Sequence, residues 1–225
     1  QNRHKDKKKG FSLYLPIEQT NLRKKLLVLS KYDGDQMRSV IEIYDLEKLK
    51  KIYTYKPNYN QINKLTTFNK TNRFKYDLED FLITSPKIDL EGNVIFNNWS
   101  VLVKTNLCGD PIWVNQETNY KQSIEKDHEG NFWVPAKNSK VNSNLVEIIG
   151  KKYGNFKEDQ ITKISNSGQT LYVKSLVDIF FENNLSHLIF GQSLFIHDPF
   201  HLTDIQPVLK DGKYWKQGDL FLNIR

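Results

Sequence analysis

Two histidines lie four residues apart near the C-terminal end of the sequence, among carboxylates. They are His197 and His201, with Asp198 between them and Asp204 shortly after. An imidazole can transfer protons near neutral pH or bind a metal ion. Pro199 disfavours a helix between the two histidines, and in an extended segment they would stand about 13 Å apart, too far to share one ion. We therefore expect no metal site at these histidines.

Motifs for nucleotide binding and for familiar nucleophiles are missing. The sequence contains neither of the glycine-rich phosphate loops, G-x-G-x-x-G and G-x-x-x-x-G-K, and no G-x-S-x-G. Cys108 is the single cysteine, which excludes an intrachain disulfide and a cysteine-based zinc site. We expect a protein without a cofactor, and the cysteine count leaves its compartment open.

The elements that position these groups are expected to be strands. The sequence has one alanine, Ala136, but 28 aromatic residues among its 225. Because alanine is the best helix former and aromatic residues suit strands, the composition argues against a helical bundle. Alternating apolar runs predict strands at 25–30, 39–44 and 51–55, the first two joined by a hairpin turn at residues 32–35. Residues 56–80 read as a long connection.

Hairpin motifs recur along the rest of the chain. The motif D-x-E-G-N before an apolar triplet occurs around Gly92 and Gly130, which are 38 residues apart. A second motif, with a lysine five residues before the glycine, surrounds Gly109 and Gly168, and a further turn is expected at Asp211-Gly212. Two hairpins make a four-stranded antiparallel unit, and a spacing near 40 is typical of a β-propeller blade. We predict an all-β propeller of such blades, with a β-sandwich as the alternative.

The length predicts an incomplete propeller. At about 40 residues per blade, 225 residues supply four or five blades. An unclosed propeller leaves an open sheet edge, so we expect further C-terminal blades or a second chain to close it. Residues 136–158 read as a polar insertion, and 175–184 as one short inserted helix with Ser175 as its cap.

Positive charge is concentrated at the N-terminal end. The net charge is +7, of which residues 1–10 carry +4 and residues 11–225 carry +3. We predict a basic flexible tail at 1–10 and a propeller domain at 11–225. The domain shows no dense basic stripe interleaved with aromatic residues, so no nucleic-acid partner is expected. No stretch approaches the roughly 18 apolar residues of a membrane span, although the basic segment is compatible with a membrane tether upstream.

Two segments near the C-terminal end resemble the arylsulfotransferase family. Residues 198–208 read DPFHLTDIQPV, and residues 214–225 read YWKQGDLFLNIR. In that family a strand with H-x-N/D-x-I precedes a strand with G-D-x-x-x-S-x-R, which correspond here to 201–205 and 218–225. The segments 27–46, 93–135 and 153–172 also resemble marine bacterial members. The resemblance implies a six-bladed propeller that moves a sulfuryl group between phenols without a nucleotide sulfate donor.

The resemblance also implies roles for particular residues. Arg225 would bind sulfuryl oxygens, two of which a guanidinium can hold at once. His201 would donate a hydrogen bond to the sulfuryl group or the bridging oxygen. The family's nucleophile is another histidine, which would lie beyond Arg225. Where the family has a histidine pair before S-I-E-x-D, this sequence has Lys121 and Gln122, and Lys121 could still attract an anion.

Three hypotheses follow from these observations. The first is an arylsulfotransferase-like enzyme with an aryl sulfate donor and a phenolic acceptor, and the family implies a periplasmic location. The second is a propeller that only binds or scaffolds, because Lys121 replaces an imidazole. The third is a nucleic-acid-binding protein that uses the basic segment 1–10.

Overall fold

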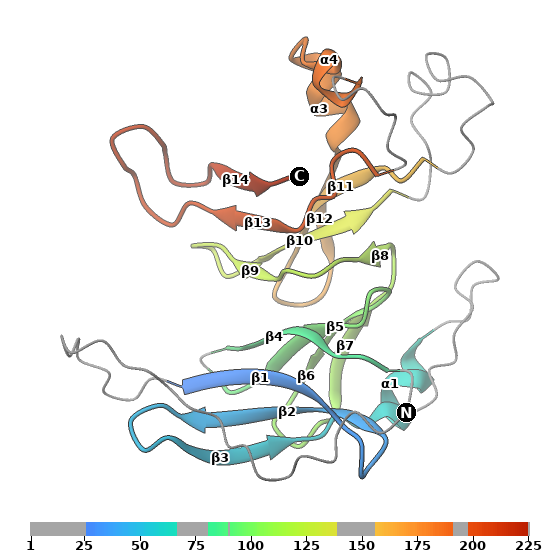
Figure 1. The fold of residues 1–225 in the computed structure, drawn as a ribbon, viewed down its shortest axis with the longest axis vertical. Coiled ribbons are helices and arrows are strands. Elements are labelled where there is room, and N and C mark those ends of the chain that lie inside the picture. Colours follow the sequence, from blue (N-terminus) through green and yellow to red (C-terminus); the bar gives the residue numbers. More distant parts are fainter. Residues whose placement is uncertain (1–25, 67–80, 90, 139–155, 191–197, 225) are drawn as a thin grey trace.

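Strands dominate the computed structural model, which describes residues 26–66, 81–89, 91–138, 156–190 and 198–224 (Figure 1). The strands are β1 (Leu26–Asp33), β2 (Arg38–Asp45), β3 (Lys50–Tyr55), β4 (Thr84–Ile88), β5 (Val94–Asn97), β6 (Leu102–Thr105), β7 (Pro111–Asn115), β8 (Asn119–Tyr120), β9 (Glu125–Lys126), β10 (Phe132–Lys137), β11 (Asp159–Ile164), β12 (Thr170–Ser175), β13 (Asp204–Pro207) and β14 (Leu220–Asn223). The helices described are α1 (Tyr59–Leu65), α3 (Leu176–Glu182) and α4 (Ser186–Phe190). The strands pair antiparallel, which confirms the predicted all-β class.

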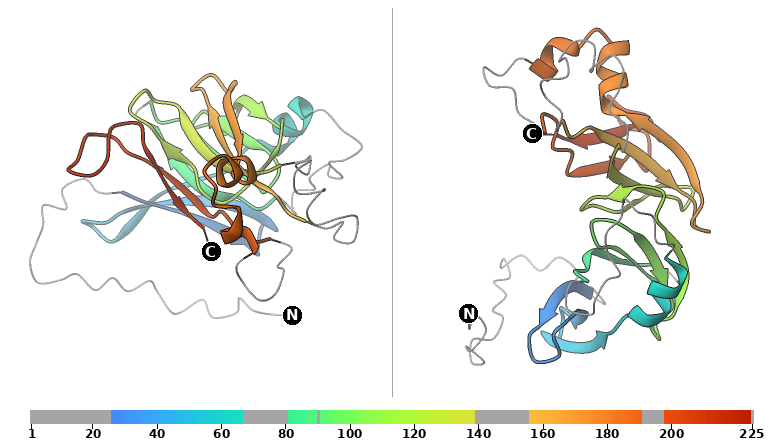
Figure 2. Two further views of the ribbon diagram at one scale, coloured as in Figure 1. Left: turned by 90° about the horizontal axis from the view of Figure 1, so that it is seen from above. Right: turned by 90° about the vertical axis from the view of Figure 1, so that its right-hand side faces the viewer.

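Each sheet is built from strands that follow one another in the sequence. The first sheet is β1-β2-β3, the second is β4-β5-β6-β7, and the fourth is the pair β13-β14. The third has the order β12-β11-β10-β8, and β9 also pairs with β10. The sheets succeed one another along the long axis in chain order, and the side view shows that their path curves (Figure 2). Within the described ranges these sheets do not close into a ring.

Apolar side chains fill the space between successive sheets. One cluster joins the first and second sheets around Ile41 and Phe96. Another joins the second and third sheets around Leu102 and Phe132. The last packs α3 and α4 against the third and fourth sheets around Leu176. Each inner sheet therefore contributes to two cores, which fixes its position against both neighbours.

The repeated glycines close the hairpins as the sequence predicts. Gly92, Gly109, Gly130 and Gly168 all have positive φ, between 85° and 93°. A residue with a Cβ adopts this conformation only at a steric cost. The turns therefore explain why two glycine motifs alternate along the chain.

Local chemistry also fixes the N-terminus of α3. The Ser175 side chain accepts a hydrogen bond from the Asp178 amide, as expected of a helix cap. The helix buries Leu176 and Val177 against the third sheet. The predicted helix at 175–184 is thus confirmed over Leu176–Glu182.

Two local predictions were wrong. The chain was expected to hold one short helix, but α1 begins within the predicted connection 56–80, and α4 follows α3. The α1 cap depends on distant groups, because Asn58 donates through its amide to Gly109 and through its side chain to Asp110. No pattern within residues 56–80 reveals these partners.

The turn expected at Asp211-Gly212 also differs from the prediction. Positive φ occurs at Gly218, at 94°, rather than at Gly212. The Gly212 amide instead donates to the Trp215 carbonyl, 2.9 Å away, inside the longer loop between β13 and β14. The predicted segment 1–10 and most of the predicted insertion 136–158 lie outside the described residues.

Candidate functional site

Lys121 lies where the edge of the third sheet is interrupted. Residues 121–124 separate β8 from β9, and both of these short strands pair with β10. The Lys121 amide donates to the Pro135 carbonyl at 2.7 Å, but Pro135 has no N–H to return a bond, so the ladder breaks here. Asn97 of the second sheet donates from its side chain to the Lys121 carbonyl at 2.6 Å. These contacts hold the backbone at Lys121 from two sheets.

The Lys121 side chain points into the protein and forms an ion pair with Asp159. Lys121 is 6% exposed, and Asp159, the first residue of β11, is fully buried. The other carboxylate oxygen of Asp159 accepts a hydrogen bond from the Leu202 amide at 2.7 Å. Burial raises the pKa of Asp159 above its usual value, while the ammonium of Lys121 opposes that rise. The charge of Lys121 is therefore already compensated inside the protein.

His201 stands beside this ion pair and contacts a second carboxylate. Its Nδ1 lies 3.0 Å from an Asp198 oxygen, and its side chain is 44% exposed. Burial alone would raise the pKa of Asp198, but the His201 hydrogen bond and the charge of Lys121 outweigh it and lower that pKa. When Nδ1–H donates to Asp198, the other ring nitrogen, Nε2, is left to act on a ligand.

The backbone at His201 is in an uncommon conformation. Its φ is 42°, in the left-handed region that non-glycine residues seldom occupy. Residues held there often cluster at functional sites, where the surrounding structure enforces the geometry. His201 is one of six non-glycine residues with positive φ in the described part of the chain, and it is the one that lies within the H-x-N/D-x-I segment.

The structure brings together two of the three predicted site residues. Lys121 and His201 are 80 residues apart in the sequence, and they meet at one cluster through Asp159, Leu202 and Asp198. In this cluster two carboxylates surround one ammonium, and the His201 ring lies beside the more exposed of the two carboxylates.

Arg225, the third predicted residue, lies outside the described residues. The strand before it returns to the same region, because the Thr203 amide donates to the Asn223 carbonyl at 3.0 Å. Asp204, which the sequence placed near the histidines, pairs through its own carboxylate with Gln206 at 2.7 Å. His197 is also outside the described residues.

Sequence reasoning did not find Asp159. In the sequence, a carboxylate at the start of the strand DQITKI reads as a solvated strand end, whereas Asp159 is fully buried in a strand that is buried at nearly every position. Its partners, Lys121 and the Leu202 amide, lie about 40 residues away on either side in the sequence. Only the tertiary structure brings them together.

Other polar and concave features offer less chemistry. A cavity of about 170 Å³ between the second and third sheets is lined by Lys87, Ile88, Asp89, Ile95, Ile124, Glu125, Lys126 and Phe132. Lys87 and Glu125 in its lining pair with each other at 2.8 Å, and the cavity contains neither Lys121 nor His201. Because the charges of Lys87 and Glu125 compensate each other, we place the candidate site at His201 and not at this cavity.

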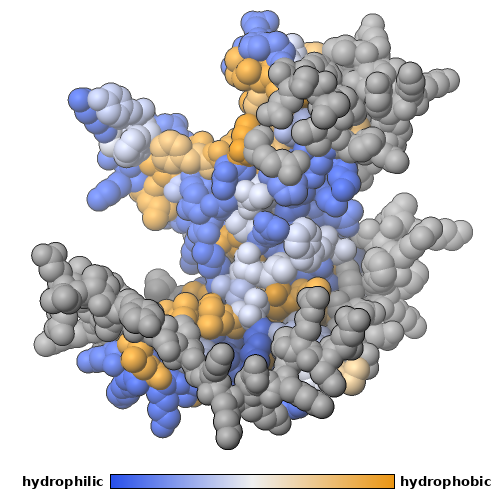
Figure 3. All heavy atoms as spheres, viewed as in Figure 1, coloured by the Kyte–Doolittle hydropathy of each residue, from blue (hydrophilic) through white to orange (hydrophobic). Residues whose placement is uncertain are grey.

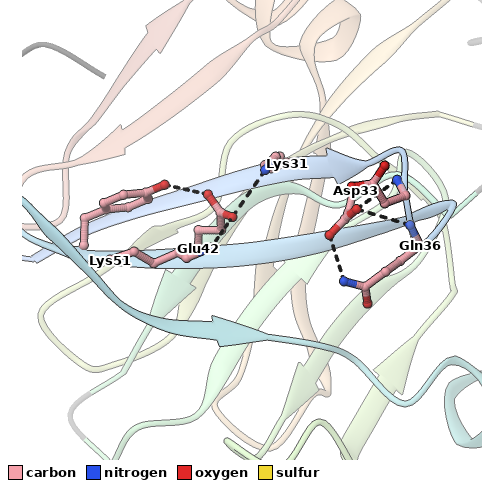
Figure 4. Close-up of polar contacts among 7 residues, drawn as sticks. Lys31, Asp33, Gln36, Glu42 and Lys51 are labelled. Carbon is pink, nitrogen blue, oxygen red and sulfur yellow. Dashed lines mark hydrogen bonds and ion pairs between the residues drawn. The ribbon is translucent and has the colours of Figure 1, made fainter. Parts of the chain in front are cut away.

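A polar cluster on the first sheet is also satisfied internally (Figure 4). Glu42 of β2 lies between Lys31 of β1, at 3.4 Å, and Lys51 of β3, at 3.0 Å. The Tyr44 hydroxyl donates to Glu42 at 2.7 Å. These three donors leave Glu42 a structural role in cross-linking the strands.

Apolar side chains gather on the ribbon formed by β13 and β14, which projects from the rest of the molecule (Figures 2 and 3). Leu209 and Phe221 are more than half exposed, and Trp215 packs edge-on against Phe221 at 5.7 Å. His201 and Asp198 precede this ribbon, so the candidate site lies at its base.

No group of three or more His, Cys, Asp or Glu side chains within the described part of the chain is arranged to hold a metal ion. None of the helices in that part is long and apolar enough to cross a membrane.

Comparisons with known proteins give little guidance. No protein-family model matches the sequence, and no curated protein matches it. Among solved structures, the chain is similar to a protein of unknown function from Bacteroides caccae, with 14% identity and a TM-score of 0.29. The match covers 67% of this chain and 57% of that protein, so the chain spans little more than half of its length. At this similarity the neighbour carries no argument about fold or function.

Proposed function

We propose that this chain is an arylsulfotransferase-type protein and that His201 contacts the sulfuryl group of an aryl sulfate. The observation that carries the proposal is the meeting of Lys121 and His201 at one cluster. The succession of antiparallel sheets with shared cores supports the finer proposal that they are blades of a β-propeller. An aryl sulfate donor, a phenolic acceptor and a periplasmic location belong to the same proposal.

The geometry gives His201 the role of a proton donor. With Nδ1–H donated to Asp198, a protonated ring presents Nε2–H to the bridging oxygen of the ester. As the bond from sulfur to that oxygen breaks, its electron pair stays on the phenolic oxygen, which takes the Nε2 proton. The sulfuryl group passes to a nucleophile that we do not assign among the described residues. In this proposal Arg225 binds the sulfuryl oxygens, as the resemblance implies.

Lys121 acts indirectly in this proposal. Its ammonium is buried and paired with Asp159, so it supports the cluster beneath His201 instead of meeting the anion itself. The same pairing favours a second candidate function, in which the protein binds aryl sulfates without turnover. In that case the chain would keep the site at His201 but lack the proton-transfer capacity of a second imidazole.

Binding and transfer of 4-nitrophenyl sulfate test the proposal. We expect His201→Ala to weaken binding about tenfold, because a hydrogen bond to a charged group is lost. His128→Ala is the matched control, since His128 is an exposed histidine in the turn before Gly130. Calorimetry measures the binding, and release of 4-nitrophenolate with phenol present measures transfer.

The outcomes separate the two candidate functions. Release that depends on His201 supports the enzyme, whereas binding that depends on His201 without release supports the binding protein. If the wild-type protein binds no aryl sulfate, or if His201→Ala binds as tightly as His128→Ala, both proposals fail.

A further inference from the structure

Two carboxylates contact neighbouring groups at the candidate site, one the His201 ring and the other the Leu202 amide. The Asp198 carboxylate lies 3.0 Å from Nδ1 of the His201 ring. The Leu202 amide donates to Asp159 at 2.7 Å. The Leu202 amide belongs to the peptide that directly follows the His201 Cα, where φ is 42°, so this bond and the ring contact hold the turn at His201 by two groups.

These two carboxylates differ in how far along the sequence their partners lie. Asp198 is three residues before His201, so its contacts are local to one turn. Asp159 belongs to β11 in the third sheet and is anchored there by the Lys121 ion pair. Of the two, Asp159 thus ties the His201 turn to the third sheet.

A buried charge pair is a costly way to stabilise a fold. Removing a carboxylate and an ammonium from water costs free energy that their attraction repays only in part, and well-packed apolar residues often serve stability as well. Asp159 and Lys121 are both buried beside an apolar core that includes Leu202 and Phe200. The buried pair is better explained if the Asp159 carboxylate is needed to hold one particular backbone donor, the Leu202 amide.

We infer that Asp159 is a positioning residue for His201. With Lys121 on one oxygen and the Leu202 amide on the other, Asp159 fixes the left-handed turn that lets the imidazole donate Nδ1–H to Asp198 and present Nε2 outward. The inference rests on the proposed function only in treating His201 as the residue that contacts the ligand.

Paired double variants test the inference. Lys121→Met with Asp159→Asn keeps an oxygen that can accept from the Leu202 amide, whereas Lys121→Met with Asp159→Leu removes it. Neither pair leaves a buried ammonium without a partner. We expect the Asn pair to keep the Nδ1–H tautomer of His201 and the Leu pair to lose it, as read from ¹⁵N–¹H correlations of the imidazole. The His201→Gln variant assigns the signal.

Ligand binding gives a second measurement. Binding of 4-nitrophenyl sulfate should be about tenfold weaker in the Leu pair than in the Asn pair, since small displacements of a contacting group are costly. If the wild-type protein binds no aryl sulfate, the proposed function fails, while the tautomer measurement still decides the role of Asp159. A folded Leu pair that keeps a single Nδ1–H tautomer would overturn the inference.

The wild-type protein provides the decisive measurement if the Leu pair does not fold. The inference requires the Leu202 amide to be bonded to a buried carboxylate, so its hydrogen exchange should be as slow as that of neighbouring strand amides. Exchange of the Leu202 amide at the rate of an exposed loop amide would show that Asp159 does not hold the turn.

Discussion

At the level of single residues, Asp89 and Asp127 occupy equivalent positions in the two D-x-E-G-N turns and make equivalent contacts. Asp127 begins a D-x-E-G-N turn, and its carboxylate accepts from the Glu129 and Asn131 amides at 3.0 and 2.9 Å. It also pairs with Lys163 at 3.0 Å. Asp89 makes the corresponding pair with Lys104, also at 3.0 Å. The lysine five residues before each second-motif glycine is thus the partner of the aspartate in the first motif.

The pH dependence of stability should report on these aspartates. Burial alone would raise the pKa of Asp127, but bonds from Lys163 and the Asn131 amide outweigh it and lower the pKa below 3.8. The unfolded chain then binds more protons than the folded one in acid, so this stabilisation is present above pH 3.8 and is lost as the pH falls below it. Asp127→Asn should lower the free energy of unfolding by about 2 kcal/mol at pH 7. It should also reduce the further loss of unfolding free energy in acid.

Urea unfolding at pH 7, 4 and 3 measures this effect. The wild-type protein should lose more unfolding free energy between pH 7 and pH 3 than Asp127→Asn does. Parallel losses in the two proteins would show that the Asp127 carboxylate is not stabilised by its turn and by Lys163.

At the level of elements, each second-motif hairpin packs its turn against the preceding sheet, at its last strand or just after that strand ends. Gly109 lies against the backbone of Lys56, and Gly168 lies against the ring of Trp113. The Trp113 indole N–H donates to the Asn166 carbonyl in the same turn, at 3.0 Å. The turn glycines therefore serve the packing between sheets as well as the turn conformation.

Replacement of Gly168 tests both the turn conformation and the packing between sheets. Its φ is 88°, and an added Cβ would lie 2.6 Å from the Trp113 ring. Gly168→Ala should lower the unfolding free energy by about 2 kcal/mol, through strain and overpacking together. Gly34→Ala is the matched control, because no atom lies within 4 Å of the Cβ added there. Equal midpoints of urea unfolding for the two variants would contradict the packing role.

Elements that depend on local chemistry could be predicted from the sequence. The strands around 25–55, the four glycine turns and the Ser175 cap depend on residues within a few positions of one another. Features that depend on distant partners could not be predicted. The cap of α1 needs Gly109 and Asp110, about 50 residues away.

The candidate site likewise has one part that the local sequence predicts and one part that depends on distant partners. His201 and Asp198 were visible as neighbours in the sequence, and their contact spans one turn. The burial of Lys121 and its pairing with Asp159 could not be read from either segment, because each looks like an ordinary exposed charge. A charge that the fold buries and compensates has no signature of its own in composition or spacing.

For the whole molecule, the arrangement of cores suggests how the chain loses structure. The first and second sheets share one cluster, while the third and fourth sheets share another with α3 and α4, and these two clusters have no residue in common. Phe81 belongs to the former and packs edge-on against Phe96 at 6.1 Å. Phe200 belongs to the latter and contacts Phe180 at 4.9 Å.

Truncating these two rings should loosen opposite ends of the molecule. Each of Phe81→Leu and Phe200→Leu removes buried volume at a cost of about 1.4 kcal/mol, which is about tenfold in local opening. Phe200→Leu should therefore speed amide exchange in α3 and β13 and leave β2 unchanged, and Phe81→Leu should do the reverse. Uniform acceleration in both variants would mean that the sheets open together, because the cluster between the second and third sheets, around Leu102 and Phe132, would then couple the two ends.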